Sequence, residues 1–379
     1  MSPSSPDAAA GTKKLLVYLF GSLGDSIVAI PALRAVRRYF PSAEIVLLQN
    51  FQSGAVVLAS QVIPETLVDR YLSYDSKLAG AGRVGVFYRL WLELRRERFD
   101  AAVSLVISER PEKAVARDRL FFRSAGIRDL YGFHAIPRDE LYPFTPDGRP
   151  LRSPNEAEFK LKRLEIDGIS GQIEDLRPPL FVPAAETLQK VNEWLADKRD
   201  GREEMLVSIA PGCKTIANQW PLENFVEIGR RLIENGGIEP IVTGGPAESA
   251  LGEELVAAWG RGINAAGVFT VPESAALLAR CGIHIGLDTG TTHLAAAVGT
   301  RCFAIYGGRN NPGLWYPLGE GHTLIRRPVA CSPCRLHECP VPGHPCMTDI
   351  TVDAVWEHLQ PMLDTGPGEG EPAIREIEV

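Results

Sequence analysis

The stretch GLDTGTTHLAAAVGT (286–300) runs from an apolar segment through an acid, hydroxyl residues and glycine into a small-residue helix pattern. Gly290 allows close approach of the backbone, while Thr289 and Thr291 offer hydroxyls and amides at a helix start, which suits a diphosphate. A carboxylate such as Asp288 repels phosphate but accepts hydrogen bonds from sugar hydroxyls. The combination predicts a nucleotide-sugar site, with helix capping by Asp288 as the alternative.

A second loop, APGCKTIANQWP (210–221), leaves a strand-like run and precedes a helical pattern. Lys214 and Thr215 stand where a cation and helix-start amides could hold phosphate oxygens. A solvated surface lysine without a ligand is the alternative. His293 lies one helical turn after Thr289, which is compatible with packing in the core or with a phosphate or sugar contact.

A third loop, GSLGDS (21–26), lies near the N-terminus. Gly21 and Gly24 permit a tight turn from strand to helix, and Asp25 with Ser26 stands at the position of a helix cap. The loop is not a dinucleotide fingerprint, because the third glycine is missing, nor a Walker loop, because Gly-Lys-Ser/Thr is missing. Asp25 is therefore either a plain cap or a functional acid.

Length and composition limit the kind of protein that carries these loops. At 379 residues the chain exceeds the usual size of one domain, which predicts two. The 45% hydrophobic and 23% charged content is typical of a soluble globular protein. No apolar run reaches the roughly 18 residues of a membrane span, and the first residues lack a signal-peptide pattern. We therefore expect a cytoplasmic protein.

Strand-like apolar runs alternate with helical patterns in both halves of the chain. Residues 14–20 and 43–48 are predicted strands around a helix, and the same alternation returns from 205 to 307. This spacing predicts parallel sheets covered on both faces, and hence two doubly wound α/β domains joined by the proline-rich segment 177–186. Ligands of such sheets bind at the carboxyl ends of the strands, where all three loops lie.

Charge is distributed unevenly along the chain. Residues 1–180 contain 25 Lys and Arg against 22 Asp and Glu, a net +3, whereas residues 181–379 contain 15 against 25, a net −10. Basic residues recur at helical spacings in RLWLELRRER (89–98) and RPEKAVARDRLFFR (110–123). These segments are either solvated helix surface or a surface for an anionic acceptor or an anionic bilayer.

Four of the seven cysteines follow one another closely, with the spacing C-x2-C-x4-C-x6-C. They are Cys331, Cys334, Cys339 and Cys346. Four thiolates in a short irregular segment could hold a structural zinc ion. Reduced packing thiols are an alternative, and a disulfide is less expected in the cytoplasm.

Longer motifs around the three loops resemble glycosyltransferase family 9, the heptosyltransferases that build the inner core of lipopolysaccharide. The resemblance covers about residues 14–360 and is most specific in IGLDTGTTHLAAAVGTRCFAIYGGRNNPGLWYP. It extends to GSLGDSIVAIPALRAVRRYFPSAEIVLL, PGCKTIANQWPLENFVEIGRRL and VTGGPAES, and the cysteine segment is similar to the usual closing segment of the family.

The resemblance implies the GT-B fold, in which two doubly wound domains face each other across a cleft. The N-terminal domain would take a lipid-linked or lipopolysaccharide-type acceptor, and the C-terminal domain a nucleotide-sugar donor, here expected to be an ADP-heptose. Transfer in this family proceeds with inversion and without a metal ion, so no cofactor is expected. No nucleic-acid partner is expected, and peripheral contact with the inner face of the cytoplasmic membrane fits such an acceptor.

Residue by residue, Asp25 matches the acid that is regarded as the general base of the family, in an acceptor-side loop with Ser22 and Gly24. Glu248 matches an acid expected near the nucleoside ribose. The resemblance and the loop chemistry together predict a donor-binding set of Lys214, Thr215, Asn218, Glu248, Asp288, Thr289, Gly290, Thr291 and His293.

One position departs from the family pattern. Asn218 stands two residues before Trp-Pro, where the family commonly has Lys or Arg. A missing cation there would weaken stabilisation of the leaving diphosphate. Either Lys214 substitutes for it, or the activity or the donor differs. A sugar-nucleotide epimerase on the same fold and a non-catalytic sugar-nucleotide-binding assembly protein therefore stay open as alternatives.

The expected organisation has four parts. An acceptor-binding domain covers 13–180, a donor-binding domain covers 181–351, and a C-terminal helix covers 352–364. Residues 365–379 are predicted to be a disordered tail, because they are rich in Gly, Pro and Glu and show no apolar period.

Overall fold

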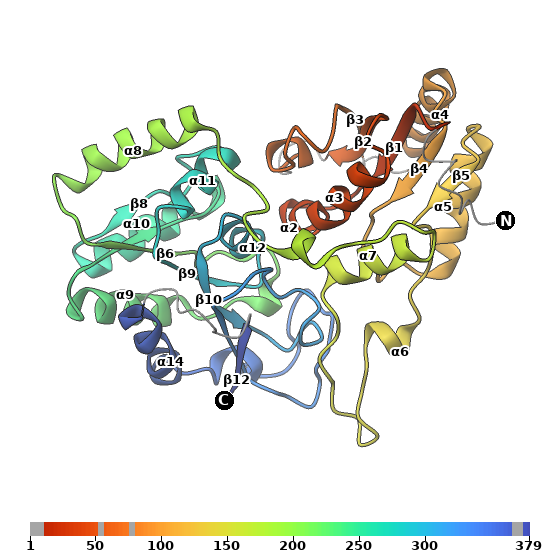
Figure 1. Cartoon of the computed structure of the whole chain (residues 1–379). Coiled ribbons are helices and arrows are strands. Elements are labelled where there is room, and N and C mark those ends of the chain that lie inside the picture. The colour runs from red at the N-terminus through yellow and green to blue at the C-terminus, as the bar shows by residue number, and fades with distance from the viewer. Residues whose placement is uncertain (1–10, 52–56, 76–79, 366–373) are drawn as a thin grey trace. The chain divides into compact units, whose positions relative to one another are not determined.

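The computed structural model describes residues 11–51, 57–75, 80–365 and 374–379. The chain divides into two compact units, Met1–Arg177 and Pro178–Val379 (Figure 1). The boundary lies inside the proline-rich segment that separates the two series of strands. Each unit contains its own parallel sheet covered by helices, which confirms the predicted pair of doubly wound α/β domains.

The sheet of unit 1 has five strands: β1 (Lys14–Tyr18), β2 (Glu44–Phe51), β3 (Arg70–Asp75), β4 (Ala101–Ser104) and β5 (Asp129–Tyr131). Their order is β3-β2-β1-β4-β5, and every neighbouring pair is parallel. Leu16 of the central strand β1 pairs with Val46 on one side and Ala102 on the other. The continuous apolar run of β1 suits a strand that is covered on both faces.

The helices of unit 1 are α2 (Leu23–Ile27), α3 (Ile30–Tyr39), η1 (Ala59–Gln61), α4 (Gly80–Glu97), α5 (Glu112–Ser124), α6 (Arg138–Leu141), α7 (Glu156–Glu165) and η2 (Ile173–Leu176). On one face of the sheet, α4 and α5 pack through Leu90 and Phe122 against Leu16 and Leu48. Helices α3 and α7 lie on the other face (Figure 1). Pro31 stands in the first turn of α3, where a missing amide hydrogen costs nothing, so a separate helix begins there after α2.

The sheet of unit 2 has seven strands: β6 (Met205–Ile209), β7 (Ile238–Val242), β8 (Ile263–Asn264), β9 (Ile283–Leu287), β10 (Arg301–Tyr306), β11 (His322–Arg326) and β12 (Ile374–Glu378). Their order is β12-β11-β10-β9-β6-β7-β8, again with parallel neighbours throughout. The chain order reverses between β6 and β9, so a ligand-binding crevice is expected where these two strands end.

The helices of unit 2 are α8 (Ala185–Arg199), η3 (Ile216–Asn218), α9 (Leu222–Glu234), η4 (Pro246–Glu248), α10 (Ser249–Trp259), α11 (Val271–Leu278), α12 (Gly290–Ala297), α13 (Pro345–Thr348) and α14 (Val352–Asp364). Trp220 is buried and donates a 2.9 Å hydrogen bond from Nε1 to the carbonyl of Ile350, which ties the end of the 210–221 loop to the segment before α14. Gly229 lets α9 pack on Trp259, because a Cβ there would lie 2.1 Å from the indole ring.

The last described residues differ from the expected disordered tail. Ile374–Glu378 forms strand β12, which lies parallel to β11 at the edge of the sheet. Tyr316 donates a 2.8 Å hydrogen bond to Glu376, and Arg326 forms an ion pair of 3.3 Å with the same carboxylate. The segment IREIE alternates apolar and charged residues with the period of a strand, a signal that is too short to stand out beside the preceding Gly- and Pro-rich residues.

Candidate functional site

The predicted site residues fall into the two units at the ends of central strands. Ser22, Gly24 and Asp25 follow β1, the central strand of unit 1. This strand lies between β2 and β4 in the sheet. The nine predicted donor-binding residues all lie in unit 2, in the loops after β6, β7 and β9 or at the start of α12.

Asp25 folds back over the loop that precedes its own helix. The backbone amide and the hydroxyl of Ser22 donate hydrogen bonds of 2.7 Å and 3.0 Å to Oδ2 of Asp25. Gly21 has a φ of +150°, and a Cβ at this position would lie 2.3 Å from Cγ of Asp25. Asp25 thus caps α2, the role that the sequence left as an alternative, and Gly21 makes room for it.

Capping does not exclude acid–base chemistry at Asp25. Burial raises the pKa of the carboxyl, and the hydrogen bond from Ser22 and the positive charge of Lys160 oppose this rise. A carboxylate with a raised pKa is a stronger base, which suits proton abstraction near neutral pH. Both capping bonds end on Oδ2, so Oδ1 is the oxygen that could accept a proton.

Helix α7 buries three charged side chains on one face. Glu156, Lys160 and Arg163 are 0%, 0% and 1% exposed, and their spacing places them one above the other. Oε1 of Glu156 accepts hydrogen bonds from Lys160 at 2.7 Å and from the Ser108 hydroxyl at 3.1 Å. Sequence reasoning missed this set, because charges at helical spacing are usually solvated and nothing in the sequence places α7 near Asp25.

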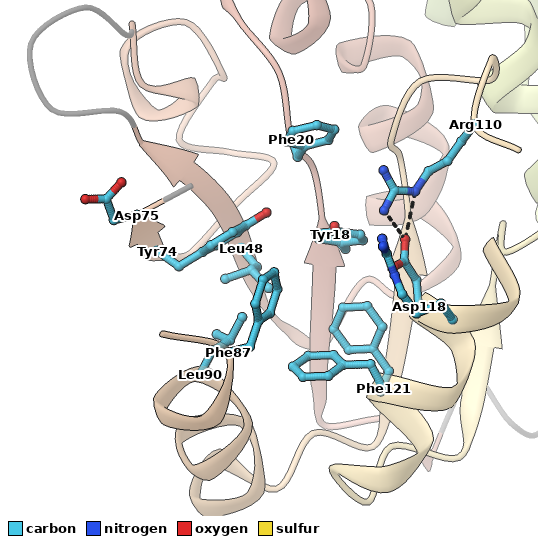
Figure 2. A pocket seen from close by; sticks show the side chains of 12 residues that line it. Tyr18, Phe20, Leu48, Tyr74, Asp75, Phe87, Leu90, Arg110, Asp118 and Phe121 are labelled. Atoms are coloured by element: carbon cyan, nitrogen blue, oxygen red, sulfur yellow. Dashed lines mark hydrogen bonds and ion pairs between the residues drawn. The ribbon is translucent and has the colours of Figure 1, made fainter. Parts of the chain in front are cut away.

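A pocket of about 410 Å³ lies between the sheet of unit 1 and helices α4 and α5 (Figure 2). Aromatic rings form much of its wall: Tyr18, Phe20, Tyr74, Phe87, Phe121 and Phe122. Phe20, which lines the pocket, is followed directly in the sequence by the acceptor-side loop that contains Asp25. Figure 2 shows Phe87 and Phe121 approaching the pocket from the two helices.

Charged groups form one side of this pocket. Arg110 donates to Oδ2 of Asp118 from Nε at 2.8 Å and from Nη2 at 2.5 Å, and Arg117 lies 3.0 Å from Oδ1 (Figure 2). The Arg110 guanidinium also lies 5.7 Å from the ring centroid of Phe20. The pocket therefore offers apolar ring faces together with hydrogen-bond donors and an acceptor.

In unit 2, the carboxylate of Asp288 is held by two side-chain amides. Asn310 donates a hydrogen bond of 2.7 Å and Asn218 one of 3.2 Å, both to Oδ2. Burial raises the pKa of Asp288 to about 6, while the Asn310 hydrogen bond and the nearby Arg309 charge lower it. Two neutral donors fix the orientation of the carboxylate without neutralising it, so Asp288 remains able to accept hydrogen bonds from hydroxyls.

Helix α12 begins immediately after this turn, with Thr289 as its N-cap. The Thr289 hydroxyl makes no capping bond, and its oxygen is buried without a partner in the part of the chain that the structure describes. Thr292 donates a 2.7 Å hydrogen bond to the carbonyl at the end of β9, which fixes the turn. The amides of Gly290 and Thr291 are in the first helical turn, where the backbone has no partner of its own, and suit phosphate oxygens.

His293 is buried and packs edge-on against Trp315, with the ring centroids 6.2 Å apart. Burial lowers its pKa to about 4, so the imidazole is neutral at pH 7. A neutral ring can donate or accept one hydrogen bond but supplies no charge to a phosphate. The structure confirms that His293 packs in the core, and a phosphate or sugar contact of its ring stays a prediction.

Glu248 lies among glycines after β7. It accepts a 2.7 Å hydrogen bond from the Gly245 amide, and a Cβ on Gly212 would lie 2.2 Å from its Cγ. Gly212 belongs to the loop after β6, so these glycines bring two strand ends together. The charges of both Glu248 and Asp288 act on the Cys213 thiol, which places the two acids in one neighbourhood.

The predicted phosphate-binding cation, Lys214, is exposed, and Thr215 is the N-cap of the short helix η3. Arg309 is a second cation that sequence reasoning did not single out. It donates from Nη1 to Oδ1 of Asn310 at 3.0 Å and from Nε to the carbonyl of Leu336 at 3.1 Å. It comes directly after the Gly-Gly that follows β10, and this position is the signal that could have identified it, since ligands bind at the carboxyl ends of such strands.

The four clustered cysteines differ in their surroundings. Cys346 is buried in the core, Cys334 and Cys339 are half-buried, and Cys331 is exposed. Burial raises the pKa of Cys346, and the neighbouring thiols add to the shift. All four are free thiols. Within the described ranges, no three His, Cys, Asp or Glu side chains are grouped so that they could hold a metal ion.

Comparison with known proteins identifies the architecture and its motifs. Residues 175–344, which include Asn218, Asp288 and Arg309, match the sequence profile of glycosyltransferase family 9 (heptosyltransferase). Over this segment the chain is similar to glycosyltransferase family 9. Lipopolysaccharide heptosyltransferase 2 of Escherichia coli K12 is 26% identical over 296 residues, which cover 75% of this chain and 81% of that protein. Lipooligosaccharide heptosyltransferase 2 of Campylobacter jejuni is 23% identical over 92% of this chain and 98% of its own.

Solved structures share the fold of this glycosyltransferase. A family 9 glycosyl transferase from Veillonella parvula has a TM-score of 0.71 at 18% identity, over 93% of this chain and 98% of that one. The E. coli ADP-heptose lps heptosyltransferase II has a TM-score of 0.63 at 20% identity, over 92% and 98%. Both support the GT-B assignment. Among the described residues, we find no helix that combines the length and the apolar character needed to span a membrane.

Proposed function

We propose that this glycosyltransferase moves a heptose from ADP-heptose to a hydroxyl of a lipopolysaccharide-core or related glycan acceptor, with inversion at the transferred carbon. The observation that carries the proposal is the oriented carboxylate of Asp288, which two amides hold at the start of α12. The carboxylate can bind sugar hydroxyls, and the helix that starts directly after it can bind phosphates. This arrangement suits the two parts of a nucleotide sugar. The names of the relatives support the choice of donor and acceptor.

Unit 2 would bind the donor. Asp288 accepts hydrogen bonds from the sugar hydroxyls, and the amides of Gly290 and Thr291 bind the diphosphate. The Thr289 hydroxyl, which has no partner among the described residues, binds it as well. Glu248 accepts a hydrogen bond from a ribose hydroxyl. Lys214 and Arg309 supply the positive charge that the family places at the position of Asn218, and they stabilise the diphosphate as it leaves.

Unit 1 would supply the base. As the bond between the sugar and the diphosphate breaks, the acceptor oxygen forms the new bond to the same carbon from the opposite side. Oδ1 of Asp25 takes the hydroxyl proton, and the nucleotide diphosphate leaves with the electron pair of the broken bond. The raised pKa of Asp25, caused by burial, supports this assignment.

The pocket in unit 1 would bind a sugar of the acceptor. Aromatic faces such as those of Phe20 and Phe121 pack against the C–H face of a pyranose, and the Arg110–Asp118 pair exchanges hydrogen bonds with its hydroxyls. A volume of about 410 Å³ is within the usual range for small-ligand pockets. A lipid-linked acceptor would bring the enzyme to the inner face of the cytoplasmic membrane.

Incubation with ADP-, UDP- and GDP-sugars, each with and without a lipid-linked glycan acceptor, tests this function. We expect ADP release from ADP-heptose that depends on the acceptor. An epimerase would change the sugar without any acceptor, and a non-catalytic binding protein would bind the donor without releasing ADP. Turnover with UDP- or GDP-sugars alone would overturn the choice of donor.

A further inference from the structure

Helices α4 and α5 of unit 1 pack side by side through named contacts. The Phe87 and Phe121 rings meet edge-on with centroids 6.0 Å apart, and Trp91 donates a 3.1 Å hydrogen bond to the Ser124 hydroxyl. The Arg95 guanidinium lies 4.8 Å from the Trp91 ring centroid. These contacts join the two helices into one surface.

Among the described side chains of that surface, three large apolar ones are more than half exposed. Val84 and Tyr88 are 71% and 60% exposed, and Leu120 is 70% exposed. Val84 and Tyr88 are one turn apart on α4, whereas Leu120 lies one turn before Ser124, on the side of α5 from which Ser124 reaches Trp91. We call Val84, Tyr88 and Leu120 the α4–α5 patch. Exposed apolar groups gathered in this way mark an interaction site, unlike single scattered ones.

Cationic side chains accompany the patch. Helices α4 and α5 expose seven basic residues and two acidic residues among their described side chains. The basic residues are Arg89, Arg95, Arg96, Lys113, Arg117, Arg119 and Arg123, and the acidic ones are Glu93 and Glu112. The net positive charge is therefore a property of the exposed surface and not only of the sequence.

The combination favours one class of partner. The phosphates of a nucleic acid would pair with the arginines, but they would make no favourable contact with exposed Val84 and Leu120. The centre of a protein interface is depleted of charge, whereas here arginines and apolar groups alternate along the same helices. Apolar groups among Lys and Arg are the composition of surfaces that lie in the interface of an anionic bilayer.

We propose that the α4–α5 patch docks unit 1 on an anionic lipid bilayer. Val84, Tyr88 and Leu120 enter the boundary between headgroups and acyl chains, and the surrounding arginines pair with lipid phosphates. The proposal rests on the proposed function in one respect, that a lipid-linked acceptor lies in such a bilayer. The inner sides of the same two helices line the aromatic pocket, so docking brings the pocket close to the lipid surface (Figure 2).

Vesicle co-sedimentation of the full-length protein tests this docking without donor or acceptor. Vesicles of phosphatidylglycerol and phosphatidylcholine are compared with pure phosphatidylcholine at low salt and at high salt. We expect at least about tenfold stronger partition into the anionic vesicles and a marked loss at high salt, because screening weakens the arginine–phosphate attraction. Equal partition into both kinds of vesicle, or no binding to either, would overturn the proposal.

Two sets of variants separate the apolar from the cationic contribution. Val84→Asp with Leu120→Asp, and Arg119→Glu with Arg123→Glu, should each reduce binding to anionic vesicles by about tenfold or more. The matched control is Ile166→Asp with Ile173→Asp, at positions in unit 1 that are 52% and 66% exposed but lie outside the patch. All these side chains are exposed, so the fold should tolerate the changes. Equal losses in the control and in the patch variants would show that binding has no defined surface.

An enzymatic comparison distinguishes failure of docking from failure of the proposed function. With a water-soluble, deacylated acceptor, the patch variants should turn over at the wild-type rate, because the patch contacts no substrate. With the same acceptor anchored in anionic vesicles, kcat/KM should fall by about tenfold. If the wild-type enzyme used neither acceptor but still bound anionic vesicles, the acceptor would be wrong and the docking surface would stand.

Discussion

The side-chain amide of Asn218 donates a 3.2 Å hydrogen bond to Oδ2 of Asp288. Asn218, which departs from the family pattern because it carries no charge, is thus a neutral hydrogen-bond donor to the carboxylate in the predicted nucleotide-sugar site. It is also buried, with 3% of its surface exposed. A lysine at position 218 would form an ion pair with Asp288, whereas the neutral amide leaves the negative charge of Asp288 available to the ligand. Arg309, which follows another strand, supplies positive charge near Asp288.

Asp288→Ala should weaken binding of the nucleotide sugar much more than binding of the bare nucleotide diphosphate. The carboxylate accepts hydrogen bonds from the sugar hydroxyls and repels phosphate. Its removal therefore deletes a favourable contact with the nucleotide sugar but none with the bare diphosphate. Calorimetry with ADP-heptose and with ADP measures the difference, which we expect to be at least about tenfold. Asp197→Ala, on an exposed side of α8, is the control. Equal losses for both ligands would contradict the role of Asp288.

Asp288→Asn should stabilise the fold at neutral pH. Burial raises the pKa of Asp288 to about 6, so the folded protein binds a proton more tightly than the unfolded chain between about pH 4 and 6, and stability falls as pH rises through this window. Asparagine avoids this loss and can still accept both amide bonds. Denaturant titrations should show a gain of about 1 to 3 kcal/mol at pH 7.5 and almost none at pH 4.

The comparison must be made between variant and wild type, because buried histidines act in the opposite direction. Burial lowers the pKa values of His284, His293 and His322 to about 3, 4 and 4. Through these histidines, the folded protein loses stability as pH falls below about 6.5. Their contribution is common to both proteins and cancels in the difference. A difference that did not vary with pH would show that Asp288 has an ordinary pKa.

Asp25→Asn should abolish sugar transfer while donor affinity and folding stay nearly intact. An amide can still accept the capping bonds from Ser22, but it cannot take a proton, and general base catalysis contributes about 100-fold to 10,000-fold in rate. Transfer assays and thermal unfolding are compared with Asp139→Asn, an exposed first-turn acid of α6. A variant that kept more than about a tenth of wild-type transfer would leave Asp25 with the capping role alone.

Arg309→Gln should lower kcat by about tenfold to 100-fold, and Lys214→Ala by a smaller factor, because Lys214 is exposed and Arg309 is partly buried beside Asn310. Glutamine keeps a hydrogen-bond donor toward Asn310, so the change removes mainly the charge. Steady-state kinetics with ADP-heptose measures the effect, with Arg280→Gln as an exposed control. Unchanged turnover in the double variant would show that the leaving diphosphate takes its charge stabilisation from other groups.

The fold was predictable because local patterns dominate it. Apolar runs with the length of strands alternate with helical periods, and parallel strands place the loops that follow them at one edge of the sheet. That argument alone located the loops of Asp25 and Asp288.

The rest of the site depends on contacts between segments far apart in the chain. Glu156 and Lys160 have the spacing of solvated helix residues, and only packing shows them to be fully buried. Asn218 lies 70 residues from Asp288, and an amide opposite a carboxylate leaves no signal in composition or period. The short strand at the C-terminus was obscured because glycine and proline precede it.

The pairing of β12 with β11 has a practical consequence for anyone who handles the protein. All five residues of β11 are buried, and β12 occupies the outer edge that β11 would otherwise present to other molecules. Shortening the chain before Ile374 would leave an uncovered strand with unsatisfied backbone groups, the usual starting point of edge-to-edge aggregation. A chain trimmed to the family-matching segment, residues 175–344, lacks β12 and is therefore expected to aggregate more readily than the full-length protein.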